Sequence, residues 1–90
     1  MREFKDRTAV ITGAASGIGL ALAQRAAREG MRLVLADIDE AKLAEAAKTL
    51  PVAADALCTR RVDVSREEDI AALADEAFSR FGGVHLLCNN

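Results

Sequence analysis

Hydrophobic and polar positions follow two different periods along this chain of 90 residues. Short runs of β-branched and apolar residues, typical of buried strands, lie at residues 8–12, 32–37, 57–64 and 84–88. Between these runs, apolar residues recur at the spacing of a helix with one buried face. Strands and helices therefore alternate, which predicts βαβ units and a parallel sheet covered by helices.

The first helix is expected over residues 18–30, directly after a turn that contains glycine. Its apolar positions Ile18, Leu22 and Ala26 recur at intervals of four residues, the spacing of residues along one side of a helix. Gly30 is a residue of the kind that commonly follows the last turn of a helix.

The second and third helices carry their own start and stop signals. Asp39 is expected to cap the second helix, which Pro51 stops. Ser65 and Glu68 match the S-x-x-E capping box at the start of the third helix, and Gly82 ends that helix.

Right-handed crossovers limit how these strands can be arranged. If successive strands step outward from the first and the chain then jumps back, the result is a doubly wound α/β sheet of spatial order 3-2-1-4. Such sheets bind ligands at the carboxyl ends of the strands, in the crevice where the order reverses. Thr12–Gly13 would lie at one lip of that crevice and Asn89–Asn90 at the other.

Composition narrows the class of protein without pointing to an activity. The chain is 51% hydrophobic and 29% charged, which is ordinary for a globular domain, and its net charge of −2 offers no basic surface for nucleic acid. It has neither an apolar run of about 20 residues nor a signal peptide, so we expect no membrane association and a cytoplasmic location. Cys58 and Cys88 fit no metal-ligand spacing and are expected to be buried free thiols.

The strongest chemical signal is the sequence TGAASGIG at residues 12–19, between a predicted strand and a predicted helix. Gly13 permits the sharp exit from the strand, Gly17 lets the backbone approach a diphosphate, and Gly19 lets the helix pack close to the sheet. The amides of residues 16–18 lie at the start of the helix, where its dipole favours an anion. A tight turn without a ligand is the alternative, and the glycine spacing makes it the weaker one.

Asp37 ends the second strand, where a carboxylate would accept hydrogen bonds from the ribose of an adenosine cofactor. Alone it could also be a helix cap or a solvated acid, but the glycine loop favours the ribose interpretation. A 2′-phosphate beside it would bring like charges within about 4–5 Å, at a cost of about 3–4 kcal/mol per charge pair before screening. Ser16 and Ile38 occupy the neighbouring positions, so no compensating cation is expected, and NAD is predicted over NADP.

Together these segments resemble the short-chain dehydrogenase/reductase family. The family's cofactor loop, its acidic residue after the second strand, its Asp-Val pair after the third and its N-N-A-G motif after the fourth are matched, in order, by residues 12–19, Asp37, Asp63–Val64 and Asn89–Asn90. The resemblance implies a Rossmann-type fold that is truncated after the fourth strand. Residues 1–90 would be the N-terminal part of a single NAD-binding domain whose C-terminal part is missing.

By that resemblance, the chain would bind each part of NAD with a different segment. Asp37 would bind the ribose, Asp63 and Val64 would hold the adenine, and Asn89 would lie against the cofactor. The residues that would bind the diphosphate are Gly13, Ser16, Gly17, Ile18 and Gly19.

Two further residues are expected to be structural. Thr12 would form a hydrogen bond to the Asn89–Asn90 segment and so tie the first strand to the fourth. His85 stands where the family often has an acidic residue, but it lies at the start of the last strand, away from the cofactor edge. We therefore interpret His85 as part of the scaffold.

The resemblance also implies an activity for the complete protein, which would transfer a hydride between NAD(H) and a small alcohol/carbonyl substrate, usually as a homo-oligomer. The family's catalytic serine, tyrosine and lysine all follow the N-N-A-G motif, and this chain contains no tyrosine. The family's proton transfer depends on that tyrosine as general acid and base. We therefore expect no catalytic residue within residues 1–90, and a chain that binds NAD without being active.

Two alternatives remain open: a non-catalytic nucleotide-binding module or sensor, and a nonfunctional truncated product. The coding sequence after Asn90 would separate them, since Ala-Gly followed by Y-x-x-x-K would make the chain an enzyme fragment. The last strand would also be an open apolar edge. The chain alone is therefore expected to be marginally stable or self-associating.

Overall fold

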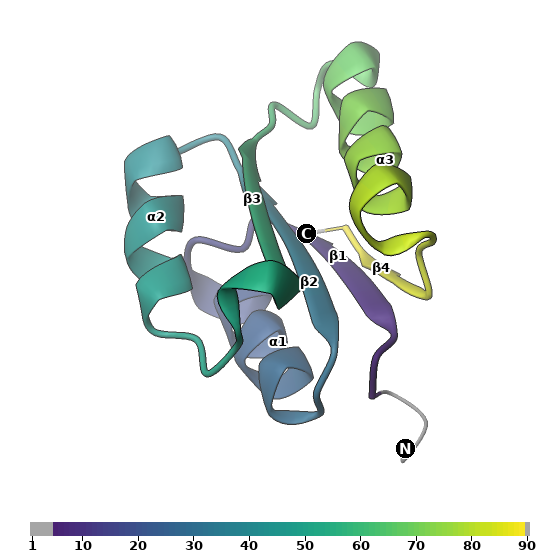
Figure 1. Cartoon of the computed structure of the whole chain (residues 1–90). Coiled ribbons are helices and arrows are strands. Elements are labelled where there is room, and N and C mark those ends of the chain that lie inside the picture. Colours follow the sequence, from purple (N-terminus) through teal and green to yellow (C-terminus); the bar gives the residue numbers. More distant parts are fainter. Residues whose placement is uncertain (1–4, 90) are drawn as a thin grey trace.

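The computed structural model describes residues 5–89, which form a parallel sheet with helices on both faces (Figure 1). In the spatial order β3-β2-β1-β4, the strands are β3 (Leu57–Arg61), β2 (Arg32–Asp37), β1 (Thr8–Thr12) and β4 (Leu86–Cys88). The helices are α1 (Gly17–Arg28), α2 (Glu40–Lys48) and α3 (Glu67–Phe81), and a short 3-10 turn, η2 (Ala54–Ala56), precedes β3. The predicted α/β class and strand order are confirmed.

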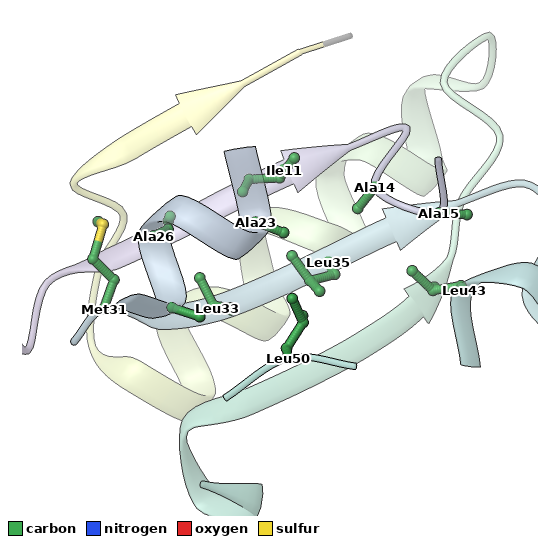
Figure 2. Close-up of a cluster of buried hydrophobic side chains, with 12 residues drawn as sticks. Ile11, Ala14, Ala15, Ala23, Ala26, Met31, Leu33, Leu35, Leu43 and Leu50 are labelled. Atoms are coloured by element: carbon green, nitrogen blue, oxygen red, sulfur yellow. The ribbon is translucent and has the colours of Figure 1, made fainter. Parts of the chain in front are cut away.

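Successive side chains along the central strands point to opposite faces of the sheet and build two layers of core. Ile11 of β1 and Leu35 of β2 belong to the layer under α1 and α2 (Figure 2). Val10 and Val34 belong to the layer under α3. Because β1 and β2 are buried on both faces, their sequences are continuously apolar rather than alternating.

Helix α1 packs on the sheet through its smallest side chains. The side chains of Ile18 and Leu22 are 72% and 38% exposed, so the stripe of apolar residues that shows the helix in the sequence is not its packed face. Small residues let a helix come close to the strands beneath it. The packed face of α1 is therefore the face with small side chains and not the face with the largest apolar side chains. The buried residues of the helix are Gly19, Ala23, Ala26 and Ala27.

The other predicted helix signals are confirmed at three helix ends. Gly30 and Gly82 follow α1 and α3 with φ of 79° and 77°, in the left-handed region that glycine adopts at little cost. Asp39 caps α2, because its Oδ1 accepts the backbone N–H of Lys42 at 3.0 Å.

The start of α3 differs from the prediction. Its N-cap is Arg66 and its first residue is Glu67, so Ser65 and Glu68 form no capping box. The Ser65 hydroxyl donates instead to Asp63 Oδ1 at 2.7 Å, while Glu68 pairs with Arg66 at 2.8 Å. In a capping box the serine oxygen would accept a backbone N–H of the first turn. Here the helix begins one residue later, at Glu67, and the Ser65 hydroxyl acts as a donor to the Asp63 carboxylate.

His85 is part of the scaffold, as predicted. Its backbone N–H donates to the carbonyl oxygen of Thr8 at 2.9 Å, and its Nδ1 accepts the backbone N–H of Thr8 at 3.0 Å. The imidazole nitrogen thus takes the place of a backbone carbonyl oxygen as the acceptor for the N–H of Thr8. The regular strand begins only at Leu86 rather than at residue 84. The third strand is also shorter than predicted and ends at Arg61 rather than at residue 64.

The β4 edge of the sheet carries exposed apolar side chains. Its strand neighbour in the described part of the chain is β1. Leu87 is 64% and Phe78 59% exposed, and both line a groove of about 290 Å³ between α3 and β4. A strand whose outer edge has no neighbour within residues 5–89, lying beside an apolar groove, is a surface on which proteins associate.

We predict that the 90-residue chain self-associates through this groove and edge. Leu87→Lys should shift the chain toward the monomer, because a lysine on an edge strand disfavours strand pairing. Analytical ultracentrifugation over a series of concentrations measures the shift. Leu22→Lys, on the exposed side of α1, is the matched control and should leave the association unchanged. A wild-type chain that stays monomeric at every concentration would contradict the prediction.

Candidate cofactor site

The glycine loop leaves β1 through a sharp turn and enters α1 with its backbone open to solvent. Gly13 and Gly17 have φ of 63° and 60°, a region that favours glycine over residues with a Cβ. A Cβ added at Gly17 would meet nothing within 4 Å. Gly19, one turn further, is buried in α1. The loop therefore offers bare backbone to a ligand at Gly17 while Gly19 keeps the helix close to the sheet.

The first turn of α1 has no anionic partner of its own. Ser16 is the N-cap residue, its side chain makes no capping hydrogen bond, and the first turn contains no acidic residue. The first amides of a helix have no acceptor within the helix, and the dipole makes this end positive. The start of α1 is thus suited to a diphosphate, which would supply both acceptors and negative charge.

Asp37 fastens the glycine loop to the end of β2. Its Oδ2 accepts the N–H of Ala15 at 3.0 Å, and its Oδ1 accepts the N–H of Asp39 at 3.0 Å. An ionised carboxylate has about four acceptor positions, so acceptor capacity remains for ribose hydroxyls. The alternative that Asp37 caps α2 is wrong, since Asp39 has that role.

Asp63 is held in a fixed orientation by its neighbours. Its N–H donates to Asp69 Oδ2 at 3.0 Å, and its Oδ1 accepts the hydroxyl and the N–H of Ser65 at 2.7 and 3.0 Å. The hydrogen bonds from the side chain and the backbone of Ser65 lower the pKa of the Asp63 carboxyl, and the positive charges of Arg61 and Arg66 act in the same direction. Asp63 therefore presents an ordered carboxylate.

The ends of β1, β2 and β3 enclose one cleft of about 210 Å³ at the carboxyl edge of the sheet. Three segments that are far apart in the sequence, namely the start of the glycine loop, Asp37 and the Asp-Val pair, meet there. The lining residues are Thr12, Gly13, Ala36, Asp37, Ile38, Val62, Asp63 and Val64.

Thr12 ties β1 to the segment that follows β4. Its hydroxyl donates to Asn89 Oδ1 at 2.9 Å, with the carbonyl oxygen of Cys88 3.5 Å away. The predicted structural role of Thr12 is confirmed for Asn89, whereas Asn90 lies outside the described residues. Asn89 itself lines the groove between α3 and β4 and does not line the cleft. Thr12 lines both the groove and the cleft.

The sequence analysis missed one cation beside Asp37. Arg61 is the register partner of Asp37 in the parallel pairing of β2 with β3, so the expectation that no cation stands near Asp37 was wrong. The sequence pattern predicts where strands lie but not which residues of two strands are register partners, so it did not place Arg61 beside Asp37. The contacts of Ala15 and Asp69 were also missed, because a backbone N–H leaves no signature in the sequence.

The glycine loop, the acidic strand end and the Asp-Val pair thus converge in a sheet of order β3-β2-β1-β4. The family model for short chain dehydrogenase matches residues 7–90. The chain belongs to the short-chain dehydrogenase family.

Individual relatives and solved structures match almost the whole chain. An uncharacterized oxidoreductase of Staphylococcus saprophyticus is 38% identical over 91 residues, which cover 100% of this chain and 39% of that protein. A solved short chain dehydrogenase/reductase from Burkholderia phymatum, in complex with NAD, is 50% identical with a TM-score of 0.89, covering 97% of this chain and 31% of that one.

A second solved structure is that of the 3-ketoacyl-(acyl-carrier-protein) reductase from Brucella melitensis, complexed with NADH. It is 35% identical with a TM-score of 0.84, and the match covers 94% of this chain and 34% of that one. This chain therefore spans about a third of the length of the proteins that it matches.

The two cysteines lie in different surroundings. Cys58 is a buried free thiol, as predicted, and burial raises its pKa. Cys88 is only half-buried, which differs from the prediction. Within residues 5–89, no group of side chains could hold a metal ion, and no helix is both long and apolar enough to cross a bilayer.

We predict that Ser65→Ala raises the pKa of Asp63 toward its ordinary value, because the variant lacks the hydroxyl that donates to the carboxylate. A carboxyl whose pKa is lowered by folding stabilises the fold above its unfolded pKa, and this stabilisation is lost as the pH falls through the folded pKa. The melting temperature of the variant should therefore depend less on pH in the acidic range.

An NMR titration of the Asp63 carboxyl carbon measures the change in its pKa directly. Ser79→Ala, at an exposed position of α3, is the matched control and should leave the titration of Asp63 unchanged. If the pKa of Asp63 were the same in the wild type and in Ser65→Ala, the hydroxyl would have no part in holding this carboxylate.

Proposed function

We propose that this chain is the NAD(H)-binding N-terminal part of a short-chain dehydrogenase/reductase. The complete protein would transfer a hydride between NAD(H) and a small alcohol/carbonyl substrate. The observation that carries the proposal is the cleft at the carboxyl edge of the sheet, which brings Gly13, Asp37 and Asp63 together beside the uncapped start of α1. The solved relatives in complex with NAD and with NADH support it.

In this proposal each segment of the site has one task. Bound NAD supplies the nicotinamide that carries the hydride, and the described residues bind and orient the rest of the cofactor. Asp37 accepts hydrogen bonds from the ribose, Asp63 and Val64 hold the adenine, and Asn89 lies against the cofactor beyond Thr12. The diphosphate is bound at the start of α1 by Gly13, Ser16, Gly17, Ile18 and Gly19.

The 90 residues by themselves should bind NAD without catalysing its reaction, because the chain contains no tyrosine to exchange the proton with the substrate. We propose that residues 1–90 form the N-terminal part of a single NAD-binding domain, in a cytoplasmic enzyme that is a homo-oligomer when complete. Neither a sensor role nor a nonfunctional product has an observation in its favour.

We predict that Gly17→Ala weakens the binding of NAD⁺ at least about tenfold, since one lost charge-assisted hydrogen bond is worth roughly 1.5–3 kcal/mol. The added Cβ would occupy the open space over which the diphosphate approaches. Isothermal titration calorimetry of the 90-residue chain measures the dissociation constant.

Gly82→Ala is a closely matched control for the Gly17 variant. Gly82 has φ of 77° and, like Gly17, no atom within 4 Å of an added Cβ, but it ends α3 outside the cleft. Both substitutions strain the backbone to a similar extent, and only one lies at the proposed site. Equal losses of NAD⁺ affinity in the two variants would assign the effect to strain, and a wild-type chain that binds no NAD⁺ would refute the proposed function.

We also propose that Asp37 makes the site prefer NAD over NADP, because its charge repels a 2′-phosphate. In Asp37→Ser, the dissociation constant for NADP⁺ divided by that for NAD⁺ should fall at least about tenfold. The variant removes roughly 3–4 kcal/mol of unscreened repulsion per charge pair. Glu40→Gln, which removes an acidic charge from the first turn of α2 outside the cleft, should leave the ratio unchanged. Equal or tighter binding of NADP⁺ by the wild type would contradict this preference.

A further inference from the structure

Two adjacent arginines of β3 point to opposite faces of the sheet. Arg60 forms an ion pair with Glu76 of α3 at 3.3 Å, so its side chain lies on the α3 face. Because side chains alternate along a strand, Arg61 points to the other face. Asp37 points to that face as well, since it follows Leu35 of the core layer under α1 and α2 at the strand period.

Arg61 lies directly beside Asp37. The two residues are partners in the parallel register of β2 and β3, and adjacent strands are separated by about 4.8 Å. The pairing continues to this point, because the N–H of Val62 donates to the carbonyl oxygen of Asp37 at 3.1 Å. Arg61 is therefore fixed at the ribose end of the cleft by the backbone of the sheet, although it does not line the cleft itself.

The guanidinium of Arg61 is not engaged by another group of the described chain. Arg61 is exposed and makes no ion pair or hydrogen bond through its side chain with residues 5–89. The two oxygens of the Asp37 carboxylate accept the backbone N–H groups of Ala15 and Asp39, and within residues 5–89 no ion pair joins that carboxylate to Arg61. The charge nevertheless acts on the cleft: after the hydrogen bonds from Ser65, Arg61 contributes to the lowered pKa of Asp63.

We propose that Arg61 is a second residue that determines cofactor specificity, and that it is the cation which binds a 2′-phosphate once the charge of Asp37 is removed. The proposal rests on the proposed function, which puts the ribose at Asp37. A phosphate on the 2′-oxygen is repelled by Asp37 and attracted by Arg61, and the preference for NAD is the difference between the two effects. A guanidinium is suited to this task because it binds phosphate through two parallel hydrogen bonds.

Two small probes isolate the effect, because 5′-AMP and adenosine 2′,5′-bisphosphate differ only by the 2′-phosphate. The dissociation constants of both probes and of NAD⁺ are measured by NMR titration on the wild-type chain and on four variants: Asp37→Ser, Asp37→Ser with Arg61→Gln, Asp37→Ser with Arg61→Lys, and Asp37→Ser with Arg60→Gln. The amide spectrum of each variant without ligand shows whether its fold is intact. Arg60→Gln is the matched control, since it removes the neighbouring arginine from the opposite face.

Asp37→Ser is expected to bind the bisphosphate more tightly than 5′-AMP, and Arg61→Gln in that background should weaken bisphosphate binding by about tenfold while 5′-AMP binding is unchanged. Arg61→Lys should retain part of the gain, and Arg60→Gln all of it. Raising the salt concentration should weaken bisphosphate binding more than 5′-AMP binding where a cation remains at residue 61, and should affect the two probes more equally in Arg61→Gln.

The outcomes separate this proposal from the function on which it rests. If 5′-AMP binds and Arg61→Gln leaves bisphosphate binding unchanged, or weakens both probes equally, the role of Arg61 is overturned while the adenosine site stands. If Arg60→Gln has the same effect as Arg61→Gln, the effect is one of net charge and the role of Arg61 is again overturned. If neither probe nor NAD⁺ binds to the folded wild type, the proposed function fails and this proposal fails with it.

Discussion

The carboxylate of Asp37 holds together the segments that form the cleft. By accepting the N–H groups of Ala15 and Asp39, it fixes the glycine loop against the end of β2 and sets the path into α2. The left-handed turn at Gly13 and the exposed start of α1 are positioned by this anchor. The residue is therefore structural before any ligand arrives, and the acceptor positions that remain give it a chemical role in the proposed complex.

On the other side of β1, hydrogen bonds that involve side chains extend the connection between β1 and the short strand β4. β4 extends only over Leu86–Cys88, and a bond lies at each end of it: the imidazole of His85 on Thr8, and the hydroxyl of Thr12 on Asn89. These two bonds bracket the pairing of β1 with β4. They hold the carboxyl end of β4 level with the glycine loop, although apolar side chains beside it remain exposed.

The sequence predicted those features that depend on the periodicity of apolar residues and on glycine. The strand order and the loop of Gly13 and Gly17 could be found in this way, because buried parallel strands and left-handed turns restrict the choice of residue. The exact start of a helix could not be predicted, as at Ser65, whose local pattern fits a helix cap but whose hydroxyl donates to Asp63 just before the helix begins. Arg61 was missed because the register of two paired strands is not visible in the sequence pattern. The packed face of α1 was not predicted because small residues form it.

The cleft is assembled entirely from residues between Thr12 and Val64, and neither α3 nor β4 lines it. During synthesis this segment leaves the ribosome before the last helix and strand of the chain do. A nucleotide that binds there would stabilise the folded state by mass action, and it would begin to do so while the polypeptide is still growing. The supply of that nucleotide in the cell would then influence how much of the protein folds.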